Sequence, residues 1–96
     1  MITLQGGRRW RLRYADPGRG NDGSCDPPTT PCKEIRLRPS LRKRPTDLVE
    51  TIIHECLHAQ GWPLDEDFVG RAAAEITRVL ERLQLIRQET PIEIPD

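Results

Sequence analysis

Both histidines of this 96-residue chain lie in one short segment, His54-Glu55-Cys56-Leu57-His58. Residues four apart lie one above the other on the same face of an α-helix, so both imidazoles can direct a ring nitrogen at one metal ion. Glu55, next to the first histidine, is placed to act on a metal-bound water. The segment therefore predicts a helix that carries a metal site. Two helix-face histidines without a metal are the simpler alternative.

Signals for the ends of this helix flank the segment. Thr46 and Asp47 are both N-cap residue types, and Glu50 is placed to complete a capping box with Asp47. Gly61 is a natural C-terminal stop, so the helix is predicted to end at residue 60.

A second helix is predicted from Asp65 to about Arg87, because apolar residues recur there at helical spacing. The residues that define this spacing are Val69, Ala73, Ile76, Leu80 and Leu83, flanked by Phe68, Ala72 and Val79.

A catalytic zinc site needs a third protein ligand, and the second helix offers Asp65, Glu66, Asp67 and Glu75. In an antiparallel helical hairpin, positions 66 and 67 come opposite His58, whereas Glu75 lies beyond the motif. Glu66 shares the predicted inward apolar face, and Asp67 does not. Glu66 is therefore the predicted third ligand, with Glu75 as the reserve and Asp67 after it. An acidic residue in a first helical turn is also favoured without any metal.

The segments Thr51–Ala59 and Leu64–Val69 together resemble the minimal core of zincin metallopeptidases, in which H-E-x-x-H binds zinc. A glutamate on the following helix is the mark of the gluzincin type. The chain is similar to small phage and bacterial metallopeptidases, and more distantly to SprT-like and ImmA-like cores, over residues 46–83. The resemblance implies one zinc ion per chain on His54, His58 and Glu66, with Glu55 as the catalytic base.

The first half of the chain alternates basic and apolar residues in two segments, 9–14 and 33–38, which predicts two strands with Ile2–Leu4 as a short partner. Residues 15–32 are rich in Gly, Pro and Asp and predict a long loop. The fold class is α+β: a single domain over 1–96, with a small antiparallel sheet of two to three strands packed against the helical hairpin. Residues 1–45 form its basic strand and loop part, 46–88 its metal-binding helical part, and 89–96 a tail.

The strand at 33–38 comes just before the metal-binding helix, so it is the predicted edge on which a peptide substrate pairs, with Ile35, Arg36 and Leu37 as substrate-binding residues. An ordinary strand protected by its charges is the alternative. Tyr14 or an arginine is a candidate to polarise the substrate carbonyl, although aromatic packing explains Tyr14 as well.

Charge is divided between the halves: residues 1–45 hold 11 Lys/Arg against 4 Asp/Glu, and residues 46–96 hold 4 against 11. A nucleic-acid surface on the basic half is one interpretation, and mutual attraction of the halves is the other. No apolar run is long enough for a membrane span or a signal peptide, so a soluble cytoplasmic protein is predicted. Cys25, Cys32 and Cys56 are then expected as free thiols, with a Cys25–Cys32 disulfide as the secondary alternative.

These patterns together predict a zinc metallopeptidase that hydrolyses peptide bonds with a zinc-activated water and Glu55 as general base. So short a chain has no second subdomain to wall a deep cleft, which predicts weak or restricted activity. The alternatives are a basic nucleic-acid-binding module and a catalytically silent zincin-like binding protein.

Overall fold

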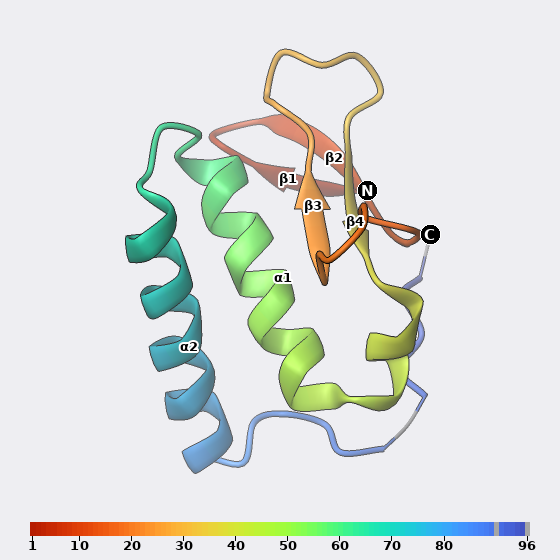
Figure 1. The fold of residues 1–96 in the computed structure, drawn as a ribbon, viewed down its shortest axis with the longest axis vertical. Helices are drawn as coiled ribbons and strands as arrows, with labels where there is room; N and C mark the ends of the chain where they lie inside the picture. Colours follow the sequence, from red (N-terminus) through yellow and green to blue (C-terminus); the bar gives the residue numbers. More distant parts are fainter. Residues whose placement is uncertain (90, 96) are drawn as a thin grey trace.

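A computed structural model of the chain describes residues 1–89 and 91–95. It is an α+β fold in which one helix, α1, lies between a second helix and a small sheet (Figure 1). The elements in chain order are β1 (Ile2–Leu4), β2 (Arg8–Tyr14), β3 (Gly23–Cys25), β4 (Glu34–Leu37), a 3-10 turn η1 (Pro39–Lys43), α1 (Pro45–Gln60) and α2 (Glu66–Arg82).

The sheet has four strands in the order β1-β2-β4-β3. β1 pairs antiparallel with β2, β2 pairs parallel with β4, and β3 pairs antiparallel with β4. The prediction of two to three antiparallel strands is therefore wrong in number and direction. The extra strand, Gly23–Cys25, comes from the predicted loop, and it was missed because three residues that begin with glycine show no alternation. The segment between β2 and β4 is long enough to return the chain for parallel pairing.

The core lies between the sheet and α1. Trp10, Ile35 and Leu37 are fully buried, as the alternating pattern predicts, and they pack with Leu48 and Ala59 of α1. Burial of side chains of this kind stabilises a fold by about 1.5–3 kcal/mol each. This contact fixes the position of α1 over the sheet.

The first helix begins at Pro45, two to three residues before the start predicted with Thr46 or Asp47 as the cap. Pro45 occupies its first turn and Arg44 is the N-cap residue, without a side-chain cap. The predicted capping box is wrong, because the Asp47 carboxylate pairs with the Arg44 guanidinium at 2.8 Å instead. The C-terminal prediction is confirmed, since the helix ends at Gln60 with Gly61 as the C-cap.

The second helix starts at Glu66, and the Asp65 side chain caps it by accepting a hydrogen bond from the Phe68 amide at 3.1 Å. It ends at Arg82, five residues before the predicted end, and Gln84 follows in a left-handed conformation (φ 57°). None of the described helices combines the length and the apolar composition that a membrane span requires.

The inward face of α2 differs from the predicted one. Val69 and Ala73 are buried as predicted, but Thr77 takes the next inward position and Ile76 is 43% exposed. The Thr77 hydroxyl donates to the Ala73 carbonyl at 2.7 Å, so its burial leaves no unpaired donor. The reason is that α2 packs along α1 and not on the sheet, so only a narrow strip of its wide apolar face is covered.

Within the predicted tail, residues 89–96, the segment 91–95 returns to the core. Ile92 and Ile94 pack against the core cluster. The Ile92 amide donates to the Arg42 carbonyl at 3.0 Å, and the Tyr14 hydroxyl donates to the Ile92 carbonyl at 2.7 Å. Residues 90 and 96 lie outside the described part of the chain.

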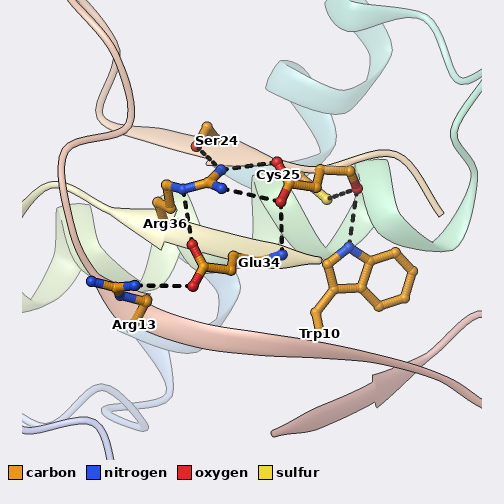
Figure 2. A network of polar contacts seen from close by, with 7 residues as sticks. Trp10, Arg13, Ser24, Cys25, Glu34 and Arg36 are labelled. Carbon is orange, nitrogen blue, oxygen red and sulfur yellow. Dashed lines mark hydrogen bonds and ion pairs between the residues drawn. The ribbon is translucent and has the colours of Figure 1, made fainter. Parts of the chain in front are cut away.

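The sheet face opposite α1 carries a ladder of ion pairs (Figure 2). Glu34 of β4 pairs with Arg13 at 3.0 Å and with Arg36 at 3.1 Å. Arg36 also pairs with Asp26 at 2.9 Å, and the Asp26 carboxylate accepts the Glu34 amide at 2.9 Å. The ladder thus links β2, β4 and the end of β3, and it explains how a strand of three residues is held in place.

Replacement of Asp26 by Asn is expected to destabilise the fold by about 1–3 kcal/mol at neutral pH, because a hydrogen-bonded charge is lost. The hydrogen bond from Arg36 holds the pKa of Asp26 below its usual 3.8. The stabilisation by Asp26 is therefore complete above about pH 4 and declines as the pH falls through the lowered pKa. Urea unfolding at pH 7 and pH 3 should show a smaller difference between variant and wild type at pH 3. Asp67→Asn should show a much smaller difference, because Asp67 is exposed and only the helix dipole favours its charge.

Candidate metal centre

Three donor side chains converge where the first turn of α2 meets the second half of α1. The Nε2 atom of His54 lies 2.8 Å from Oε1 of Glu66, and Nε2 of His58 lies 2.7 Å from Oε2 of the same carboxylate. One ligand atom from each of the three residues falls within 4.8 Å of the other two. The three residues predicted as metal ligands are therefore brought together.

The local folding of the hairpin explains this convergence. His54 and His58 lie one turn apart on α1, and their ring centroids are 4.9 Å apart. The Asp65 cap starts α2 so that Glu66, in its first turn, comes back over the histidines. Glu75, the reserve ligand, lies about two and a half turns further along α2 and pairs with Arg71 at 3.9 Å. Neither Glu75 nor Asp67 belongs to the cluster.

The cluster fits a tetrahedral zinc ion with a small adjustment. Zinc binds imidazole nitrogen and carboxylate oxygen at about 2.0–2.2 Å, which sets neighbouring ligand atoms about 3.3 Å apart in a tetrahedron. The distances of 2.7 and 2.8 Å join the two histidines to different oxygens of Glu66. A zinc ion would therefore require these contacts to open by about half an ångström and one carboxylate oxygen to turn toward the point between both imidazoles. The Glu66 side chain is 69% exposed and is free to make that movement. Two imidazoles and one carboxylate are a donor set typical of catalytic zinc.

Glu55 lies beside the cluster, but its side chain is buried in the interior of the protein. It is 7% exposed, and it is one of two polar residues buried in the described part of the chain. Burial raises its pKa to about 7, with the nearby His54 acting in the opposite direction and Glu66 adding to the rise. A divalent cation next to it would favour its ionised form. A carboxyl group with a pKa in this range can accept and return a proton near neutral pH.

A close contact between α1 and β3 sets the position of Glu55. A Cβ atom at Gly23 would lie 2.7 Å from Thr51 Cγ2 and 3.0 Å from Glu55 Cγ, which is too near for any other residue type without a shift. Glycine at position 23 therefore lets the strand approach the helix at the level of the candidate metal centre. This requirement cannot be recognised in a loop-like sequence before the pairing of β3 is known.

A cavity of about 520 Å³ opens over the three donors. Its walls come from α1, from the first residue of α2 and from the segment that leads into β3. It is acidic, because four carboxylates and no Lys or Arg line it. The lining residues are Gly20, Asn21, Asp22, Gly23, Glu50, Thr51, His54, Glu55, His58 and Glu66. The residues of this wall from Gly20 to Gly23 were not predicted individually, although the length of the loop is typical of functional segments.

The prediction that the strand at 33–38 offers a free edge is wrong. β4 lies between β2 and β3, and Ile35 and Leu37 are fully buried, while Arg36 is held in the ion-pair ladder. The strand was predicted as an edge because it comes just before the metal-binding helix, yet its charged side chains pair with those of the neighbouring strands. Ile35, Arg36 and Leu37 therefore offer no free strand edge with which a peptide substrate could pair.

The strand with a free edge beside the candidate metal centre is β3. Its antiparallel pairing directs the Asp22 carbonyl to Arg38 at 2.8 Å and the Asp26 amide to Glu34 at 3.0 Å. Since backbone groups alternate in direction along a strand, those of Gly23 and Cys25 point away from β4, to the open side. This edge borders the cavity at Gly23.

Other candidate residues lie elsewhere. The Tyr14 hydroxyl is bonded to the Ile92 carbonyl, so the prediction that Tyr14 polarises a substrate is not supported by its position. The three cysteines are free thiols, as predicted. Burial raises the pKa of Cys25 to about 12, so this thiol is neutral at physiological pH.

A second hollow of about 270 Å³, which shares Glu55 and His58 with the main cavity, is lined by Cys25 and Trp62.

Comparisons of the chain with protein-family models, with curated proteins and with solved structures found no match.

Proposed function

We propose that the chain is a zinc-dependent peptidase that binds one zinc ion through His54, His58 and Glu66. The observation that carries the proposal is that two imidazole nitrogens and one carboxylate lie within 4.8 Å of one another, with a buried carboxyl group beside them. The resemblance of residues 46–83 to zincin cores leads to the same reaction. The three ligands come from two helices that the α1–α2 hairpin holds together.

Different residues of the chain have different roles in the proposed hydrolysis. When bound, zinc supplies a Lewis acid that polarises a carbonyl and lowers the pKa of water. Glu55 accepts a proton as the nucleophile forms and returns it to the departing amine. His54 and His58 hold their ring nitrogens in place through the rigid helix. Asn21 is a neutral polar residue in the cavity lining.

The substrate proposed is an extended peptide that lies along β3. Backbone groups of Gly23 and Cys25 point to the open edge, where a peptide strand can pair with them. The acidic lining of the cavity favours a peptide with basic residues near the cleaved bond. The hollow beside Trp62 is suited to an apolar side chain of the same peptide.

Incubation of the zinc-loaded chain with an unfolded, lysine-rich protein tests the proposal. We expect new amino termini to appear with time, and we expect a chelator to stop their formation and added zinc to restore it. Cleavage that persists unchanged in the chelator would contradict the metal-dependent reaction. Zinc binding without cleavage of any unfolded protein would favour the alternative, a catalytically silent zincin-like binding protein.

The nucleic-acid alternative has weaker support from the described residues. Arg13 and Arg36 are engaged in the ion-pair ladder, and Arg44 pairs with Asp47. Charges neutralised in this way contribute less to phosphate binding. The alternative remains a prediction that a salt-dependent binding assay with DNA and RNA would test.

A further inference from the structure

The outer face of α2 carries an apolar stripe that the fold leaves uncovered. Phe68 and Ile76 are each 43% exposed, Val79 is 57% exposed and Leu83 is 63% exposed, with Ala72 between them. Their spacing of four, four, three and four residues places all five on one side of the helix. Figure 1 shows α2 at the outside of the molecule, with α1 between it and the sheet. Monomeric proteins seldom expose a continuous apolar stripe of this kind.

The side chains along the stripe are ordered so that the stripe can pack against an antiparallel copy of itself. When two copies of α2 lie antiparallel about a two-fold axis at Ile76, Phe68 of one copy comes level with Leu83 of the other. Ala72 then comes level with Val79, which sets a small residue against a larger one, and Ile76 meets its own counterpart. From this pattern we propose that the chain forms a symmetric dimer through the stripe on α2. A two-fold axis of this kind is the commonest symmetry of soluble oligomers.

The negative charge in the first turn of α2 disfavours a parallel arrangement, in which two acidic turns would meet. The first turn of α2 contains Glu66 and Asp67, and its last turn contains Arg82. The last turn also contains Glu81 and so has no net charge. Antiparallel packing keeps the two acidic first turns apart, and it also opposes the helix dipoles. Arg71, which comes level with Arg82 of the second copy, already has Glu75 of its own chain 3.9 Å away. Parallel packing would bring like ends together.

The dimer leaves the candidate metal centre open. The Glu66 carboxylate contacts His54 and His58 on the side of α2 that faces α1, whereas the stripe lies on an outer side of the same helix. The stripe extends over about 22 Å, which is short for a permanent interface. We therefore expect a reversible dimer whose population rises with protein concentration.

Sedimentation equilibrium of the full chain, from low to high micromolar concentration, tests the proposal. We expect the mean mass to rise from the 11.0 kDa of the chain toward twice that value. Ile76→Glu should keep the mass at that of one chain, because it places two carboxylates together at the two-fold axis. Arg78→Glu is the matched control: it adds more negative charge at an exposed position two residues away, off the stripe, and should leave the dimer intact.

Disulfide trapping provides a second measurement that does not depend on the stability of Ile76→Glu. In a Cys32→Ser background, Ile76→Cys should form a covalent dimer on mild oxidation, and Arg78→Cys should form at least tenfold less. A chain that stays monomeric at every concentration would overturn the proposal. So would a dimer that Ile76→Glu leaves unchanged, or equal trapping at positions 76 and 78.

Discussion

Glu55→Gln should reduce peptide cleavage by about 10²- to 10⁴-fold, the usual contribution of a general base or acid. Glutamine has nearly the same shape as glutamate, so it fills the same buried site against Gly23. It cannot accept a proton, and the reaction would have to proceed without that transfer. Initial rates of cleavage, measured with zinc in excess, would give the ratio.

The control for this substitution is Glu50→Gln. Glu50 is another carboxylate in the wall of the same cavity, and it is not part of the donor cluster. Its replacement tests whether any loss of negative charge from the cavity slows cleavage, and the rate should change by only a few-fold. Zinc content should be the same in both variants. If Glu55→Gln cleaves as fast as the wild type while retaining zinc, Glu55 is not the base.

Gly23→Val should destabilise the chain by about 2–3 kcal/mol, a cost typical of an overpacked contact. The first added carbon alone would lie 2.7 Å from Thr51 Cγ2, and the two methyl groups add to the conflict. The strand and α1 must then separate, which moves Glu55 as well. Denaturant unfolding would measure the loss of stability, and cleavage should fall by more than the loss of folded protein explains.

Gly70→Ala is the matched control for that prediction. A Cβ atom at Gly70 meets nothing within 4 Å, and the residue lies inside α2. Alanine should therefore raise the free energy of unfolding by about 0.5–1 kcal/mol through its better helix propensity. If Gly23→Val is as stable as the wild type, the close approach of β3 to α1 is not as the structure describes it.

The sequence was most informative where one physical rule decides the outcome alone. The positions of His54 and His58 depend only on the pitch of a helix, and the choice of Glu66 depends only on a short hairpin. The structure brings the three side chains together, and their role as metal ligands stays a prediction. The alternation that buries Trp10 and Ile35 was also read correctly, because a half-buried strand has few other patterns.

Features that depend on long-range pairing could not be predicted. Whether the strand at 33–38 is an edge depends on Gly23–Cys25, a segment without any pattern of its own. Likewise, Ile76 fits an inward position by spacing alone, but α2 has one neighbour and that neighbour covers Thr77 instead. In both cases the outcome depends on which element packs beside the strand or helix, and the local sequence does not determine that neighbour.

Zinc titration of the metal-free chain tests the central claim most directly. We expect one equivalent to bind and to raise the melting temperature, since zinc stabilises the state that holds its ligands together. Glu66→Gln should weaken binding by more than about 100-fold, because even residues that only hydrogen-bond to a ligand contribute about 10- to 100-fold. Glu75→Gln, the matched change at the reserve position, should leave affinity unchanged. A wild-type chain that binds no stoichiometric zinc, or equal losses in the two variants, would contradict the account.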